Sequence, residues 1–202
     1  MHLATNKSDK APRVLTIGHS NHSLERFMEL LGMHGVEVVV DTRSNPWSKY
    51  AAHFDKESLK ESLRRAGLKY LFLGQELGGR PADDSFYDAE GHVLYDRVAK
   101  SKAFEEGISR VKQGVDKFVV ALLCAEENPE SCHRRLLVGR VLSSHGVSVC
   151  HIRGDGRLQS ENELSIELKE REKQLSLLNE DSTWKSIPSV LRKRRQSNSS
   201  RL

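Results

Sequence analysis

The chain has 202 residues, a length typical of one domain with terminal extensions, and 37% of them are hydrophobic, which is enough for a core. The net charge of +4 comes largely from residues 192–195 and Arg201, so it does not indicate a basic binding face on the body of the chain. No apolar run is long enough to cross a membrane, and the N-terminus lacks the apolar core of a signal peptide. The three cysteines fit no disulfide framework and favour a reducing compartment, the cytoplasm, or the nucleus if the basic run is a localisation signal in a eukaryote.

Short apolar segments that alternate with amphipathic ones predict strands alternating with helices. The predicted strands are residues 14–17, 36–40, 70–73, 118–123 and 147–152. The predicted helices are residues 24–34, 55–66, 95–113 and 129–145, and each is followed by a glycine suited to a helix C-terminus, at Gly35, Gly67, Gly114 and Gly146. This alternation predicts a three-layer α/β domain with about five mostly parallel strands and helices on both faces of the sheet.

The terminal segments differ from this pattern and suggest a division of the chain. We expect a disordered lead over residues 1–12, the α/β domain over 13–158, a helical extension over 159–185 and a basic disordered tail over 186–202. A charged amphipathic helix is predicted over residues 164–178, and Trp184 is the one large apolar anchor beyond it. The basic tail suits nucleic-acid contacts or nuclear localisation, and the alternative is a solvated terminus without a partner.

Reactive residue types gather where the predicted strands end. In an open parallel sheet ligands bind beyond the carboxyl ends of the strands, so side chains at those ends are expected to share one edge. They are, in chain order, His19, Ser20 and Asn21; Asp41 and Arg43; Gly78, Gly79 and Arg80; Cys124 and Glu126; and, on the following helix, Cys132, His133 and Arg134.

Residues 122–135, LLCAEENPESCHRR, hold the densest set of these groups. Asn128 is a suitable N-cap and Pro129 suits a first helical turn, which predicts that Cys132 lies near a helix N-terminus. The helix dipole and the neighbouring Arg134 would then lower the pKa of the Cys132 thiol and favour a nucleophile or a metal ligand. The alternative is that Cys132 is a small buried apolar residue and His133 an ordinary surface histidine.

Four motifs in combination resemble the uncharacterised family called domain of unknown function 488, over about residues 14–155. They are Thr16-Ile17-Gly18-His19-Ser20-Asn21, Asp41-Thr42-Arg43 with Pro46 and Ser48, Leu73-Gly74 with Leu77-Gly78-Gly79-Arg80, and Leu122-Leu123-Cys124-Ala125-Glu126 with Cys132-His133-Arg134. Thr42 departs from the pattern, in which an apolar residue is expected between the aspartate and the arginine. The resemblance implies a single α/β domain with these motif residues as its functional set, and it implies no agreed activity.

The first functional hypothesis is an enzyme that uses cysteine chemistry on a phosphorylated or nucleotide-like substrate, including one derived from nucleic acid. Its expected catalytic groups are Cys132 or Cys124 as nucleophile, His19 or His133 as base, and Asp41 and Glu126 as supporting carboxylates. Its expected substrate-binding groups are Arg43, Arg80 and Arg134 for an anion, with Ser20, Asn21, Gly78 and Gly79 beside them. The sequence contains neither a phosphate-binding P-loop, nor a dinucleotide fingerprint, nor the C-x₅-R cradle of cysteine phosphatases.

Two further hypotheses remain. One is a Zn²⁺ or Fe²⁺ site with Cys124, Cys132 and His19 as candidate ligands, together with His133 and Asp41. Because adjacent helical residues point to different sides, Cys132 and His133 are not both expected to bind one ion. The other is a non-catalytic module that binds nucleic acid or a protein, with the basic tail contacting phosphates.

Overall fold

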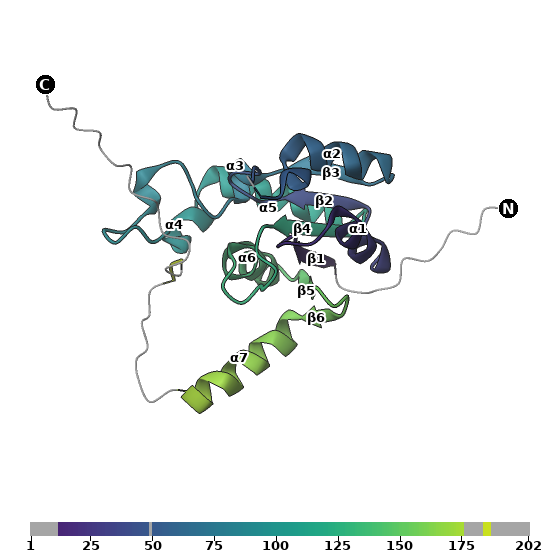
Figure 1. Cartoon of the computed structure of the whole chain (residues 1–202). Helices are drawn as coiled ribbons and strands as arrows, with labels where there is room; N and C mark the ends of the chain where they lie inside the picture. The colour runs from purple at the N-terminus through teal and green to yellow at the C-terminus, as the bar shows by residue number, and fades with distance from the viewer. Residues whose placement is uncertain (1–11, 49, 176–183, 187–202) are drawn as a thin grey trace, which may run out of the picture.

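A six-stranded sheet forms the centre of the computed structural model, which describes residues 12–48, 50–175 and 184–186 (Figure 1). The strand order is β3-β2-β4-β1-β5-β6. Five strands are parallel: β1 (Arg13–Gly18), β2 (Val38–Asp41), β3 (Lys69–Phe72), β4 (Val120–Cys124) and β5 (Ser148–Ile152). They confirm the predicted sheet. The antiparallel edge strand β6 (Leu158–Ser160) was not predicted, because its three residues carry no apolar pattern.

Helices cover both faces of the sheet and bury the alternate residues of each strand. On one face α1 (Leu24–Met33) and α2 (Lys56–Arg65) pack against Leu15, Ile17 and Val39. On the other face lie α3 (Gly74–Leu77), α4 (Tyr95–Ala99), α5 (Lys102–Val115) and α6 (Arg140–Ser144). Val38 and Val40 point to this second core, whereas Val39 between them points to the first. The predicted three-layer α/β arrangement is therefore confirmed.

The glycines after the helices act as predicted in three of four cases. Gly35, Gly67 and Gly146 have positive φ angles of 61°, 77° and 79°, the left-handed conformation that ends a helix. Gly114 lies inside α5, which continues to Val115. The single helix predicted over residues 95–113 is wrong, because the Ser101 side chain accepts a hydrogen bond from the Phe104 backbone N–H and starts α5 as a separate helix.

The helix after β4 begins later than predicted. Pro129 does not open it: residues 130–131 form a turn, and the first helical residue is His133. The carbonyl oxygen of Cys132 accepts hydrogen bonds from the backbone N–H groups of Arg135 and Leu136. A π-helical stretch, Arg134–Gly139, follows and leads directly into α6. Cys132 therefore sits immediately before the helix and not within its first turns.

The C-terminal extension begins with α7 (Glu161–Leu175), three residues earlier than predicted, and this helix projects away from the sheet (Figure 1). The Trp184 indole packs edge-on against the Tyr95 ring and donates a hydrogen bond to the Leu136 carbonyl oxygen at 3.0 Å. Of the predicted terminal segments, residues 1–11, 176–183 and 187–202 lie outside the described residues, and with them the last three residues of the helix predicted over 164–178. No helix in the described part of the chain is long and apolar enough to span a membrane.

Candidate active site at the carboxyl end of the sheet

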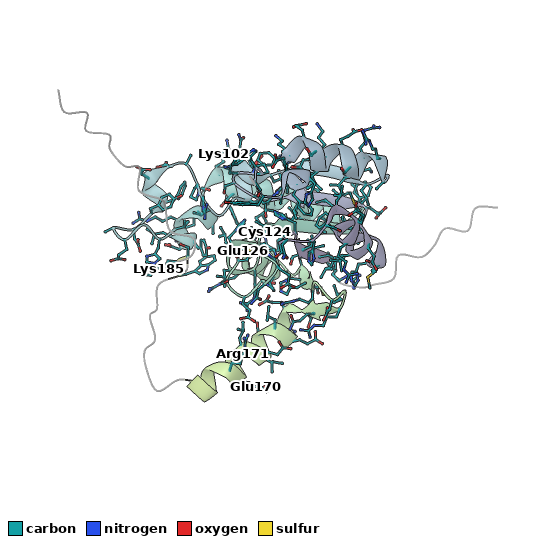
Figure 2. The ribbon with its side chains drawn as sticks, in the orientation of Figure 1. Lys102, Cys124, Glu126, Glu170, Arg171 and Lys185 are labelled. Carbon is teal, nitrogen blue, oxygen red and sulfur yellow. The ribbon has the colours of Figure 1, made fainter. Side chains whose placement is uncertain are left out.

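A pocket of about 160 Å³, with mostly polar and charged residues around it, lies where the central strands end. Figure 2 shows Cys124 and Glu126, which belong to its wall, near the middle of the molecule. Its lining residues are Arg43, Ser44, Asn45, Gly79, Arg80, Cys124, Ala125, Glu126 and His133. The pocket thus joins the ends of β2 and β4 with the segment after α3 and the start of the helix at His133.

Two thiols and an imidazole meet beside this pocket. The Nδ1 atom of His133 lies 3.6 Å from the Cys124 sulfur and 3.9 Å from the Cys132 sulfur. The Nε2 atom of His133 lies 3.1 Å from the Thr42 carbonyl oxygen. Because a carbonyl oxygen can only accept a hydrogen bond, the neutral ring carries its proton on Nε2 and presents the Nδ1 lone pair to the two thiols. The expectation that Cys132 and His133 would point apart is wrong, since the helix starts only at His133.

The environment separates the protonation states of the two thiols. A hydrogen bond from Cys132 lowers the pKa of Cys124 well below the ordinary thiol value despite burial, and His133 and Arg134 add to this effect. Burial and the neighbouring Cys124 raise the pKa of Cys132 well above that value. Burial acts to lower the pKa of His133, but the Cys124 thiolate raises it overall. The arrangement favours a Cys124 thiolate paired with a His133 imidazolium.

The two glycines after α3 allow close packing beside the pocket, and Gly79 is the one that gives the His133 ring its space. A Cβ atom on Gly79 would lie 2.6 Å from Cγ of the His133 ring, closer than atoms of this kind approach in proteins. A Cβ atom on Gly78 would overlap the Gly74 carbonyl oxygen and the Ser44 hydroxyl. Gly79 therefore allows the His133 imidazole to pack closely against its backbone, and Gly78 allows the close approach of Gly74 and Ser44.

Two arginines line the pocket, and they differ in burial and in their partners. The Arg43 guanidinium is buried and binds both oxygens of the Asp41 carboxylate, and the Tyr70 hydroxyl also donates to that carboxylate at 2.7 Å. Burial and Asp41 raise the pKa of Tyr70. Arg80 is exposed at the rim, its backbone N–H donates to the Ser44 hydroxyl, and its guanidinium has no partner among the described residues. Asp41 thus faces Arg43 and Tyr70 and does not line the pocket.

Arg134 lies behind the site and holds the loop that carries Glu126. Its fully buried guanidinium donates to the carbonyl oxygens of Glu126 and Glu127 and, at 3.3 Å, to the Thr16 hydroxyl. Every one of these acceptors is part of the protein, so Arg134 shapes the loop and does not reach the pocket. The Glu126 side chain does line the pocket, and burial together with the Cys124 thiolate raises its pKa.

The His19-Ser20-Asn21 segment comes close to Cys124 through its backbone. The His19 N–H donates to the Cys124 carbonyl oxygen at 3.0 Å, and the His19 ring stacks on Phe54 with centroids 4.4 Å apart. Burial and Arg43 lower the pKa of His19 to about 4, which keeps the ring neutral. Ser20 has a strained positive φ of 45°, and Asn21 is exposed. None of the three lines the pocket, and His19 lies outside the cluster formed by Cys124, Cys132 and His133.

Several site residues were not predicted from the sequence. Ser44, Asn45 and Ala125 line the pocket; Ser44 and Ala125 directly follow the predicted positions Arg43 and Cys124, and Asn45 comes one residue later, so the ends of the strands were the available signal. Thr42 has two roles: its hydroxyl donates to the Leu123 carbonyl oxygen at 2.8 Å, and its own carbonyl oxygen orients His133. The hydroxyl explains how a polar residue fits the position where the family pattern predicts an apolar one.

The fold and site together define an open α/β sheet protein with a thiol, imidazole and guanidinium pocket at the carboxyl ends of its strands. Residues 23–141 match the family model described as Domain of unknown function DUF488, and the chain belongs to this family. The match confirms the resemblance and covers β2 to β4, while the Thr16–Asn21 motif lies before it. Neither a curated protein nor a solved structure shows significant similarity to the chain.

Proposed function

We propose that the protein is an enzyme in which Cys124 is the nucleophile and a small phosphorylated or nucleotide-like compound is the substrate. This proposal depends on the position of Cys124, which lines the pocket with its sulfur 3.6 Å from Nδ1 of His133. The other ring nitrogen of His133 is hydrogen-bonded to the Thr42 carbonyl oxygen. A cysteine of lowered pKa beside an oriented imidazole is the usual form of an activated thiol nucleophile.

The remaining pocket groups suit an anionic substrate. Arg80 offers a guanidinium that no other described residue binds, and Arg43, oriented by Asp41, lines the same pocket. In the proposed reaction the Cys124 sulfur forms a bond to the electrophilic atom of the substrate, and the bond to the leaving group breaks. The Glu126 carboxyl, with its raised pKa, supplies the proton that the leaving group takes up. Water then attacks the same atom, its hydroxyl replaces the Cys124 sulfur, which leaves as the thiolate, and its proton returns to Glu126.

The test is the pH dependence of alkylation by iodoacetamide, followed by mass spectrometry of the modified peptide. In a Cys132→Ser, Cys150→Ser protein, Cys124 should be alkylated with a midpoint at least one pH unit below about 8.5, the ordinary thiol value. The matched control is a Cys124→Ser, Cys132→Ser protein, in which only Cys150 remains. Burial raises the pKa of Cys150, so its midpoint should lie above the ordinary value. Phosphate should slow the alkylation of Cys124 and leave Cys150 unaffected. A midpoint for Cys124 at or above that of Cys150 would contradict the proposal.

One observation favours a second candidate, a protein with Zn²⁺ or Fe²⁺ at the same thiols. The sulfurs of Cys124 and Cys132 and Nδ1 of His133 all lie within 4.8 Å of one another. Tetrahedral Zn²⁺ would hold sulfur and nitrogen ligands roughly 3.6 Å apart, close to the observed 3.6 and 3.9 Å. The hydrogen bond from His133 Nε2 to the Thr42 carbonyl oxygen is also of the kind that orients a histidine whose other nitrogen binds a metal. The pocket beside Cys124 and His133 would leave a position for substrate, and the ion would supply Lewis-acid chemistry.

Metal analysis of the purified protein separates the two candidates. A metal site predicts about one ion per chain, lost in a Cys132→Ser variant. The nucleophile proposal predicts that Cys132→Ser keeps a reactive Cys124, since serine also donates a hydrogen bond. A Cys150→Ser variant is the control for both measurements, because Cys150 lies in β5 away from the cluster.

A further inference from the structure

Two exposed aromatic side chains lie on the loop that follows the pocket arginine. Trp47 is 63% exposed and Tyr50 is 92% exposed, whereas most of the large apolar side chains in the described residues are covered. The loop leaves β2 through Ser44 and Asn45, which line the pocket, so Trp47 and Tyr50 are two and five residues from the pocket wall. Since an extended chain spans at most about 3.6 Å per residue, the Trp47 backbone lies within about 7 Å of that of Asn45, and Tyr50 follows on the same connection.

The backbone of this loop is held in place by polar side chains. The Ser48 N–H donates to the Asp55 carboxylate at 2.8 Å, and the Ser48 hydroxyl accepts from the N–H groups of Tyr50 and Ala51 at 3.3 and 3.2 Å. The Lys56 N–H donates to the Pro46 carbonyl oxygen at 2.9 Å and closes the loop. Trp47 and Tyr50 are therefore exposed on a segment whose backbone is held by hydrogen bonds before and after them.

The size of the pocket indicates how a ligand would use these rings. Sites that enclose a whole drug-sized ligand have volumes of about 300–1,000 Å³. The volume of about 160 Å³ found here suits a phosphate group between Arg43 and Arg80 and leaves the rest of the ligand outside. A planar group on that ligand would meet the exposed rings of Trp47 and Tyr50, which offer flat apolar faces for stacking.

We propose that Trp47 and Tyr50 form a stacking surface for the base of a nucleotide whose phosphate occupies the pocket between Arg43 and Arg80. This inference rests on the anion site of the proposed function and names its substrate class. The nucleotide can be free or can be the end of a single strand, since both offer a phosphate and a base at the same separation. The aromatic rings supply the preference for a base, and the arginines supply the preference for a phosphate.

The test compares adenosine 5′-monophosphate with ribose 5-phosphate, which share the sugar phosphate and differ in the base, by titration calorimetry. The full chain should bind the nucleotide roughly tenfold or more tightly, the range expected for base stacking on an aromatic ring. In a Trp47→Ala, Tyr50→Ala variant the two affinities should become equal. Ile166→Ala is the matched control, because Ile166 is an exposed apolar side chain on α7, and it should leave the ratio unchanged. A 5′-phosphorylated trinucleotide that binds more tightly than the free nucleotide would identify a strand end as the source.

The possible failures can be told apart. If both phosphate esters bind the full chain with equal affinity, the stacking surface is wrong and the anion site stands. If the nucleotide preference survives the double substitution, the base is bound elsewhere and the inference is likewise overturned. If neither compound binds, the anion site fails, and the stacking surface fails with it.

Discussion

The Arg43 guanidinium donates from Nε and Nη2 to the two carboxylate oxygens of Asp41, at 2.9 and 2.7 Å. Both side chains are buried, and the Arg43 backbone N–H adds a third bond to the same carboxylate at 3.0 Å. The Asp41 carboxylate fixes the direction of the Arg43 guanidinium at the end of β2 and balances much of the guanidinium charge. The proposed anion site therefore has one arginine oriented by a carboxylate, Arg43, and one, Arg80, whose guanidinium has no partner in the part of the chain that the structure describes.

Replacing Asp41 with Asn should destabilise the protein by about 3 kcal/mol, since it leaves a buried guanidinium without its counter-charge. The measurement is the free energy of unfolding in urea. Asp155→Asn is the matched control: Asp155 pairs with Arg157 at an exposed position, and its loss should change stability by about 0.5 kcal/mol or less. Equal effects of the two substitutions would show that the buried pair has no special role.

Replacing Gly79 with Ala should displace the His133 ring, because the new Cβ atom would lie 2.6 Å from it. We expect the alkylation midpoint of Cys124 to rise toward the ordinary thiol value, with a loss of about 1–3 kcal/mol in stability from overpacking. Gly32→Ala provides the comparison: it lies in α1 with open space around its Cβ position, and should be neutral or stabilising by up to about 1 kcal/mol. A Gly79→Ala protein with an unchanged Cys124 midpoint would refute this role.

The neutral, buried His19 predicts a specific pH dependence of stability. Its pKa falls from 6.5 in the unfolded chain to about 4 in the folded protein, so between these values the unfolded chain binds the extra proton. Stability that is present above pH 6.5 is therefore lost as the pH falls toward 4, by up to about 3 kcal/mol. Urea unfolding at pH 7, 5.5 and 4 should show this loss in the wild type.

A His19→Gln variant isolates that contribution. Burial also lowers the pKa of His151, so the variant should keep part of the acid sensitivity, and the difference between the two proteins reports His19. We expect this difference to shrink steadily between pH 6.5 and 4 as the wild type loses its advantage. Parallel curves for the two proteins over this range would show that His19 is not buried in its neutral form.

Replacing Arg134 with Ala should cost about 3 kcal/mol or more, since two buried carbonyl oxygens and the Thr16 hydroxyl lose a charged donor. The loop of Glu126 should loosen, which is measurable as faster amide hydrogen exchange at residues 125–128. Arg64→Ala serves as the reference, because Arg64 pairs with Glu61 on the exposed side of α2 and its loss should be nearly neutral. Unchanged exchange in this loop would argue against the clamp.

The fold was largely predictable because its signals are local. Buried parallel strands appear as short apolar runs, and helix ends appear as glycines, so five strands and most of the helices could be located. β6 and the break at Ser101 were missed, because each depends on two or three residues with little pattern. The π-helical stretch at Arg134–Gly139 has no sequence signal, and the helix begins at His133 instead of Pro129 because a turn at residues 130–131 comes between them.

By itself the sequence determined which residue types reach the carboxyl edge of the sheet, because Asp41 and Cys124 are the last residues of parallel strands and their neighbours follow directly. Only the tertiary structure decided which of them share the pocket and which way each side chain turns. Arg43 and Arg134 look alike in the sequence, yet one lines the pocket and the other holds backbone carbonyls behind it. The reason is physical: rotamers, tautomers and pKa values depend on partners from distant segments, such as the Thr42 carbonyl for His133, and local sequence does not specify them.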